Sequence, residues 1–444
     1  MNSGDTAWLL ASAALVLLMT PGLAFFYGGM VREKSVLNML MMSVSSMGVV
    51  GVLWLLYGYS AAFGSDLGAG LLGNPLHYFG LQGLLGTDSL QQTVPTTAYV
   101  AFQAMFAIIT VALISGAIAD RARFGPWLVF AAVWATIVYF PVAHWVFNTD
   151  TKDAAGTVVQ HGGWIVNQLG AIDFAGGTAV HINAGAAGLA LALVLGRRVG
   201  WPRGPMRPHN VPFVMLGAGL LWFGWFGFNA GSAFAANTTS AVVFVNTLGA
   251  TCAAMLSWML VERLRDGRPT TLGAASGIVA GLVAITPACS SVTPVGALAV
   301  GVCAGVFCAL AVGLKYRLGF DDSLDVVGVH LVGGLVGTLL IGLLASSSAP
   351  AGVSGLFYGG GLDQLGKQAA AAGAVLGFSL LVTLVLGMLL KVTLGFRLPA
   401  AREMDGIDEA EHAESAYHFR EDSRARRATT TASATQVSAP EEQS

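Results

Sequence analysis

The composition of this chain excludes a water-soluble protein. It has 444 residues, of which 55% are hydrophobic and 10% charged, whereas soluble domains carry about 25% charged residues. A net charge of −2 excludes nucleic acid as the main partner, and the sequence contains no phosphate-binding loop. The four cysteines form no CxxC pair, so neither a disulfide framework nor a zinc site is indicated. The chain is predicted to be an integral membrane protein in a lipid bilayer.

Long apolar runs indicate eleven membrane-spanning helices. A span needs about 20 mostly apolar residues, and the runs are too long and too continuous for strands of a membrane barrel. The fold class is therefore an all-α polytopic membrane protein. The predicted spans are 6–28, 38–62, 96–118, 124–147, 174–195, 211–231, 239–261, 272–288, 292–314, 326–346 and 370–396.

Basic residues predict the orientation of these spans. Connections on the cytoplasmic side are enriched in Lys and Arg. The connections after spans 1, 3, 5, 7 and 9 hold 13 of the 22 basic residues, and seven more lie from Lys391 onward. The other connections hold only Lys152 and Lys367. This alternation predicts an N-terminus outside and a C-terminus inside.

Two parts of different composition are predicted. Residues 1–396 form the transmembrane domain, whose first span is interpreted as a retained helix because no basic region precedes it. Residues 397–444 form a charged cytoplasmic tail, and its polar end is predicted to be disordered.

A short internal repeat links the fifth and tenth spans. The strings VHINAGAAG and VHLVGGLVG share a histidine, His181 or His330, followed by glycines four and seven residues later. Each half then holds five spans, an odd number, so helices 1–5 and 6–10 are predicted to form an inverted repeat around a narrow pore, an arrangement typical of transporters. The two histidines are then expected to meet near the pseudo-twofold axis.

Ionisable residues inside spans are the first candidates for function. An intramembrane histidine is functional by default, although His181 and His330 could also be core side chains bonded to backbone carbonyls. Paired imidazoles could share one proton. Asp173 lies eight residues before His181 at the start of its span. It could cap that helix, hold negative potential beneath an outer vestibule, or do both.

Aromatic residues gather at the outer ends of spans 3 and 6. Phe102 and Phe106 lie one turn apart, and Trp225 and Phe228 precede Ser232. Most membrane aromatics belong to interfacial belts or to packing. Where several rings converge with a hydroxyl near a mouth, however, a small cation could exchange water for ring faces.

Eight long strings then give a resemblance to a known family. They are FYGGMVREKSVLN, YGYSAAF, FQAMFAIIT, DFAGGTAVHINAG, PHNVPFVMLGA, WFGWFGFNAGSA, ASGIVAGLVAITPAC and DVVGVHLVGGLVG. In this order they resemble the ammonium transporter family (Amt/Mep, related to the Rh proteins). The resemblance covers nearly the whole chain.

The resemblance implies roles for the candidate residues. Ammonium would be recruited at an outer aromatic vestibule, deprotonated and passed through a hydrophobic pore lined by twin histidines. The recruiting residues would include Phe102, Phe106 and Ser232 with Asp173 in support; the pore gate would be Phe106 and Phe228 with Trp225 beside it; the twin histidines would be His181 and His330.

One position departs from the family pattern. The family often has a recruiting tryptophan three residues after a histidine at the end of span 4, and this chain has Phe147 there. Trp164 follows in the next, longer connection. Either Phe147 completes the substrate site or Trp164 folds over the mouth.

The resemblance also implies partners and leaves rival functions open. The family forms homotrimers, and its tail meets PII-type nitrogen signal proteins. Neither a cofactor nor a metal is implied, and the protein is expected to be a transporter in the plasma membrane rather than an enzyme. The alternatives are an Rh-like channel for ammonia or carbon dioxide, an ammonium sensor, and a haem protein with two axial histidines. Whether charge moves with ammonia stays open.

Overall fold

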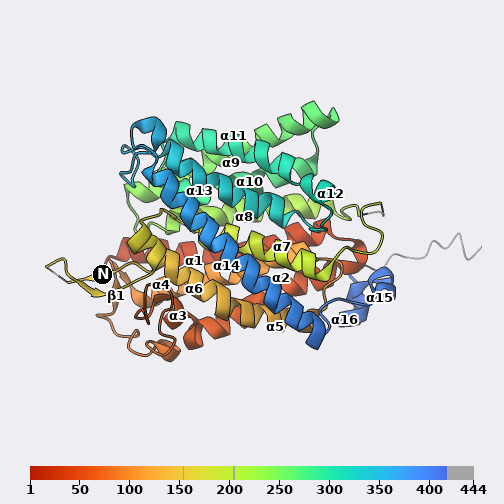
Figure 1. Cartoon of the computed structure of the whole chain (residues 1–444), viewed down its shortest axis with the longest axis horizontal. Helices are drawn as coiled ribbons and strands as arrows, with labels where there is room; N and C mark the ends of the chain where they lie inside the picture. Colours follow the sequence, from red (N-terminus) through yellow and green to blue (C-terminus); the bar gives the residue numbers. More distant parts are fainter. Residues whose placement is uncertain (154, 204–205, 418–444) are drawn as a thin grey trace, which may run out of the picture.

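A computed structural model describes residues 1–417 except 154 and 204–205. Within this part of the chain, eleven helical segments are long and apolar enough to cross a membrane, as the sequence predicted. They run roughly parallel, and Met1 lies at the opposite end of the bundle from the helices of the tail (Figure 1). The end with Met1 is called the N-terminal face below, and the end with the tail is called the C-terminal face.

Several spans combine an α-helix with a short π or 3-10 turn. The bounds of the spanning elements are α1 Ser3–Met30, η1 Glu33–Ser35, α2 Val36–Leu53, η2 Trp54–Gly58, α3 Tyr59–Phe63, α4 Thr96–Ile114, η4 Ser115–Ile118, α5 Phe124–Trp134, η5 Ala135–Tyr139, α6 Phe140–Phe147, η7 Gly177–Ile182, α7 Asn183–Leu195, α8 Val211–Gly231, α9 Thr238–Asp266, α10 Thr271–Ala288, α11 Pro294–Ala311, α12 Leu314–Leu318, η8 Val327–Leu331, α13 Val332–Leu344 and α14 Asp363–Thr393.

Short elements form the connections on the N-terminal face. Two short helices form the described part of the tail on the C-terminal face. The strands β1 and β2 pair antiparallel, as do β3 and β4. The bounds are η3 Phe79–Leu81, β1 Leu90–Gln91, β2 Val94–Pro95, β3 Thr151–Lys152, β4 Val158–Gln160, η6 Ile165–Leu169, η9 Leu356–Tyr358, α15 Ala400–Asp405 and α16 Ile407–His412.

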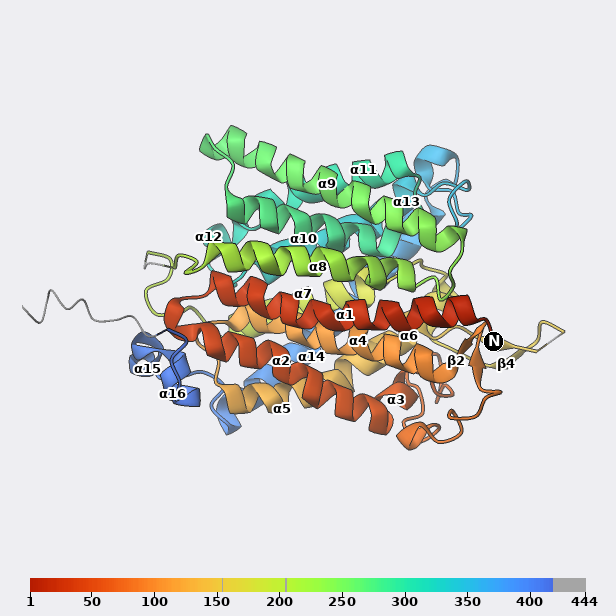
Figure 2. The same cartoon turned by 180° about the vertical axis from the view of Figure 1, so that it is seen from behind.

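Glycines allow α1 and α8 to run side by side through the bundle (Figure 2). A Cβ on Gly29 of α1 would lie 2.6 Å from the carbonyl oxygen of Asn210, and one on Gly227 of α8 would lie 2.8 Å from that of Ser12. Any side chain at these positions would therefore push the helices apart. Such close backbone contact is typical of membrane helices.

The C-terminal face holds a buried ionic network between three connections. Arg198 donates to both oxygens of Asp321 at 2.9 Å and to Asp120 at 2.9 Å. Burial alone would lower the pKa of Arg198, but the hydrogen bonds to Asp321 and the charge of Asp120 outweigh it and raise the pKa. Arg121 donates to the backbone carbonyl of Asp321 at 2.6 Å, and burial lowers its pKa to about 10.

The first part of the predicted tail is folded against this face. The carboxylate of Asp408 accepts hydrogen bonds from the backbone amides of Leu37 and Asn38, at 3.0 and 2.8 Å, and so caps the start of α2. Glu403 accepts from the amide of Val199 at 2.6 Å. The predicted disorder of the tail's end falls on residues 418–444, outside the described part of the chain.

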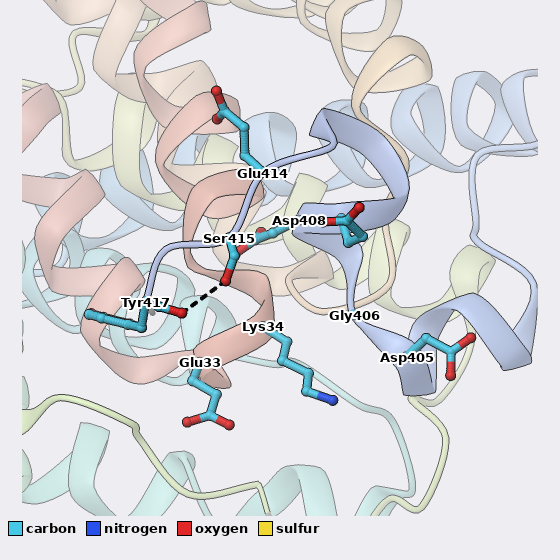
Figure 3. Close-up of a pocket in the computed structure, with 9 residues that line it drawn as sticks. Glu33, Lys34, Asp405, Gly406, Asp408, Glu414, Ser415 and Tyr417 are labelled. Atoms are coloured by element: carbon cyan, nitrogen blue, oxygen red, sulfur yellow. Dashed lines mark hydrogen bonds between the residues drawn. The ribbon is translucent and has the colours of Figure 1, made fainter. Parts of the chain in front are cut away.

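Beside this contact, the tail and the start of α2 enclose a cavity of about 250 Å³. Figure 3 shows Glu33 and Lys34 of η1, the turn before α2, on one side and Asp405 and Glu414 of the tail on the other. The side chains that line the cavity are mainly polar or acidic.

Candidate pore and its aromatic entrance

Two phenyl rings lie face to face between α4 and α8. The centroids of Phe106 and Phe228 are 4.0 Å apart, with planes 18° from parallel, and both side chains are fully buried. Their helices place them there because α4 runs away from the N-terminal face while α8 runs towards it. On the other side, the ring of Phe228 lies over that of His181, with centroids 6.2 Å apart.

Three further candidate residues surround this ring pair. Phe102, one turn nearer the N-terminal face, has its ring 4.9 Å from that of Phe106. The hydroxyl of Ser232 donates to the carbonyl of Phe228 at 2.8 Å. Phe147 approaches Phe106 edge to face, with centroids 6.3 Å apart. The structure therefore brings these residues together from α4, α6 and the end of α8.

Trp164 lies elsewhere on the N-terminal face. Its ring packs against Trp145 at a centroid distance of 5.9 Å, and its backbone amide donates to the carbonyl of Gly70 at 3.1 Å. Trp145 in turn packs against Phe378 of α14. Among the described ring contacts, Phe147 and not Trp164 adjoins Phe106.

Deeper in the bundle, the two intramembrane histidines are in direct contact. Nδ1 of His181 and Nδ1 of His330 are 3.3 Å apart, and the rings are nearly parallel at 24°. In a hydrogen bond between them, one of these nitrogens carries the proton and the other accepts it. Nε2 of His181 is buried and has no hydrogen-bond partner among the described residues.

The histidines lie on a lumen that is otherwise apolar. Six aliphatic side chains and Met19 contribute to it: Leu23, Ile109, Leu113, Val180, Leu221 and Val279. The lumen offers about 10 Å³ to the centre of a water-sized molecule, which is close to the space that a single water needs. A porphyrin cannot fit here, so the geometry argues against the haem alternative.

Asp173 caps the helix that carries His181. Its carboxylate accepts hydrogen bonds from the backbone amides of Gly176, Gly177 and Thr178, at 2.8, 2.6 and 2.7 Å. It also accepts from the amide of Ala179 at 3.2 Å and from the hydroxyl of Thr178. Both oxygens are thus engaged by the first turn of η7, as the capping interpretation predicted.

Sequence reasoning missed the residues that hold Trp225 in place. Its ring stacks on His181 with centroids 5.3 Å apart, and its Nε1 donates to the hydroxyl of Thr286 at 2.8 Å. That hydroxyl adjoins Oδ1 of Asn229 at 3.3 Å, and Nδ2 of Asn229 donates to Thr247 at 3.0 Å. Asn229 lies in the string FNAGSA, Thr286 in AITPAC and Thr247 in FVNTLGA, but no local pattern pairs them.

Replacing Thr286 by valine is expected to destabilise the protein by about 1–3 kcal/mol, because the buried indole N–H of Trp225 would lose its acceptor. Transport is expected to slow as well, since Trp225 would no longer be held against His181. Thermal unfolding and initial transport rates would measure the two effects. Thr338→Val is the control, because its buried hydroxyl has no partner within the described residues. Equal effects of the two substitutions would contradict the positioning role.

Comparison with known proteins agrees with this geometry. A profile of the Ammonium Transporter Family matches residues 7–417. An ammonium transporter of Mycobacterium bovis is 67% identical over 439 residues, covering 94% of this chain and 91% of the relative. The crystal structure of Saccharomyces cerevisiae Mep2 superimposes with a TM-score of 0.82 at 36% identity, over 90% of this chain and 88% of Mep2.

A solved structure described as a sensor Amt protein is also similar. Its TM-score is 0.83 at 29% identity, over 92% of this chain and 98% of the other. The family profile and the relative named as a transporter nevertheless favour a transporter over a sensor. The match across nearly the whole chain, together with eleven apolar helices, confirms the resemblance found in the sequence. This chain belongs to the ammonium transporter family, as a multi-pass protein of the cell membrane that transports and is not an enzyme.

Proposed function

We propose that this protein takes up ammonium through the lumen between Phe106 and the histidine pair, with its N-terminal face outside the cell. The observation that carries this proposal is the stacked phenyl pair next to two imidazoles in contact. Aromatic faces attract a cation and imidazole nitrogens handle protons. An ion that is both a small cation and a proton donor suits this order of groups.

The first step is recruitment of the ion at the aromatic entrance. Phe102, Phe106 and Phe147 converge near the hydroxyl of Ser232. A cation over a phenyl face gains about 0.5–2 kcal/mol, and a hydroxyl can accept one N–H. The cap at Asp173 adds a negative charge on this side of His181, which favours cations over anions.

The second step is loss of the proton before the apolar lumen. A bare cation in so narrow an apolar passage would lose its hydration, at a penalty of several kcal/mol. Ammonia is neutral and can donate and accept hydrogen bonds with the imidazoles. Nε2 of His181, which has no hydrogen-bond partner among the residues that the structure describes, offers such a contact. Potassium has no proton to release, so the pore selects ammonium over potassium by this proton loss rather than by ion diameter.

The decisive experiment records charge displacement in proteoliposomes after a jump in ammonium and then in potassium. A saturable current for ammonium alone would support electrogenic transport. An internal pH rise without current would favour the Rh-like gas channel. The absence of both signals would contradict transport and favour a sensor.

The outer site gives a prediction of its own. Replacing Phe147 by tryptophan is expected to lower the ammonium KM about two- to fivefold, because an indole face binds cations more strongly than a phenyl face by about 0.5–1 kcal/mol. Trp164→Phe is the matched control and should leave KM unchanged, since Trp164 packs against Trp145. A shift in KM with Trp164→Phe alone would place the recruiting ring on Trp164 instead.

We further propose the larger arrangement implied by the family. His181 and His330 each lie in a π turn followed by a 13-residue α-helix, which supports an inverted repeat of helices 1–5 and 6–10. The protein is proposed to form homotrimers, with the folded tail as the contact for a PII-type signal protein on the cytoplasmic side. The mass of the purified protein in detergent tests the trimer.

A further inference from the structure

Asp322 occupies the same place before His330 that Asp173 occupies before His181. Each aspartate lies eight residues before its histidine. Oδ2 of Asp322 accepts a hydrogen bond from the backbone amide of Val327 at 2.7 Å, at the start of η8, just as Asp173 caps η7. The two carboxylates lie towards opposite faces of the bundle, because the chain enters η7 from the N-terminal face and η8 from the C-terminal face.

The two aspartates differ in how their oxygens are used. Both oxygens of Asp173 accept hydrogen bonds. By hydrogen-bond geometry, Oδ1 of Asp322 is buried without a partner in the described part of the chain, and the residue is only 1% exposed. The backbone amide of Val326 also acts on this carboxylate. A buried carboxylate oxygen without a donor is rare because its desolvation is uncompensated. This oxygen can therefore accept a hydrogen bond from a ligand that binds and dissociates.

Asp322 lies on the C-terminal side of the lumen, next to segments that line it but not among the lining residues. Leu23 and Leu113 line the lumen. Tyr27, one turn after Leu23, donates its hydroxyl to the carbonyl of Leu113 at 3.1 Å and interacts electrostatically with Asp322. The next residue, Ser323, donates its amide to the carbonyl of Ala117 at 3.2 Å, at the end of the same lumen-lining segment.

The charged side chains near Asp322 do not form an ion pair with its carboxylate in the described part of the chain. Lys315 donates to the backbone carbonyl of Asp322 at 2.9 Å and to the carboxylate of Asp325 at 2.6 Å. Arg121, Lys315 and Asp325 act on it electrostatically, as does the hydroxyl of Tyr27. Within the described residues, no cationic side chain lies within 4 Å of its carboxylate oxygens. Burial, only partly offset by the charge of Lys315, raises the pKa of Asp322 to about 6.

We propose that Oδ1 of Asp322 binds ammonium at the C-terminal end of the pore, so that the pathway has a cation site at each end. This inference rests on the proposed function, because the ligand is the transported ion. The ion would donate one N–H to the free oxygen and meet the carboxylate charge. Lys315 stays on the backbone carbonyl and on Asp325, which keeps the carboxylate free for the ion.

The test compares ammonium applied to each face separately, in oriented membrane vesicles that are either right-side-out or everted. Asp322→Asn keeps an acceptor for the Val327 amide and removes the charge. The KM for ammonium at the C-terminal face is expected to rise about tenfold, because hydrogen bonds to charged groups are the strong ones. The KM at the N-terminal face is expected to stay within about twofold.

Asp405→Asn is the matched control, because it removes an exposed carboxylate from the same face. Equal changes of KM at both faces, or no change at the C-terminal face, would overturn the proposal. If wild-type vesicles gave no saturable ammonium current from either side, the proposed function itself would fail. If the wild type gave a saturable current and Asp322→Asn left its KM unchanged, only the proposed cation site at Asp322 would be ruled out, and the proposed function would stand.

The pH dependence of the wild type provides a second test that needs no variant. As the pH falls through about 6, Asp322 takes up a proton and loses its charge, while ammonium remains almost fully protonated. The KM at the C-terminal face is therefore expected to rise in acid, and that at the N-terminal face to stay flat. A KM that stays constant at both faces between about pH 5 and 7.5 would contradict a cation site at Asp322.

Discussion

Replacing His181 and His330 together by alanine is expected to abolish the discrimination of ammonium from potassium. The two rings contact each other across a lumen with room for about one water molecule. Without them the lumen would widen and hydrate, so ions could pass without losing a proton. We expect the current ratio of ammonium to potassium to fall at least about tenfold, or about 1.4 kcal/mol of discrimination.

Charge displacement in proteoliposomes, with equal jumps of the two ions, measures this ratio. His161→Ala is the matched control, because that imidazole is exposed on the N-terminal face and pairs weakly with Asp150 at 3.9 Å. If the double variant kept both its flux and its selectivity, the histidines would not be the selecting element. Complete loss of flux with intact folding would instead make them essential for conduction.

Replacing Asp321 by alanine is expected to give the largest loss of stability. Arg198 would lose its bonds to both carboxylate oxygens, and the buried Arg121 would lose its nearest anionic partner, 4.0 Å away. Removing one partner of a buried ion pair costs about 3–5 kcal/mol, because the remaining charge stays desolvated. Thermal unfolding in detergent, followed by loss of the folded peak on gel filtration, measures this effect.

Asp363→Ala is the control for this prediction, since Asp363 forms an exposed pair with Lys367 one helical turn away. Such surface pairs contribute about 0–1 kcal/mol. Should both substitutions lower the unfolding midpoint equally, the buried network would contribute no more than a surface pair.

The same network gives a pH dependence of stability. Although burial acts to raise the pKa of Asp321, its hydrogen bonds to Arg198 lower it overall. The carboxylate therefore stabilises the fold above its unfolded pKa of about 4, and that contribution is lost as the pH falls through the lower folded value. The wild type should lose this stability in acid, whereas Asp321→Ala should lack that part of the loss.

The helices could largely be predicted because membrane crossing depends on the composition of local segments. The predicted span 124–147 coincides with Phe124–Phe147, and 272–288 differs from Thr271–Ala288 by one residue. The last predicted span, 370–396, began too late, since the helix starts at Asp363. Gln364 donates to Gln368, which in turn donates to the carbonyl of Ile172, so polar residues that ended the apolar run are buried in the helix.

The site was only partly predictable, because its contacts join side chains from separate segments. The sequence brought His181 and His330 together through a repeat of nine residues, and the aromatic strings indicated an entrance near Phe106. The eight-residue spacing before each histidine was also present, but it did not single out Asp322. A spacing reveals equivalent positions in two helices, whereas the partners of a side chain come from other segments.

By itself, then, the sequence determined a bundle of eleven apolar helices, a charged end opposite its N-terminus, and two histidines in an apolar setting. Only the tertiary structure decided that Phe147 adjoins Phe106 while Trp164 packs on Trp145. It alone shows that both oxygens of Asp173 accept hydrogen bonds, whereas one oxygen of Asp322 has no hydrogen-bond partner by geometry within the described residues. Local composition sets which segments enter the membrane, because burial in lipid acts on each helix separately. Hydrogen bonds and ring contacts join residues far apart in the chain, so their pattern exists only once the helices have packed.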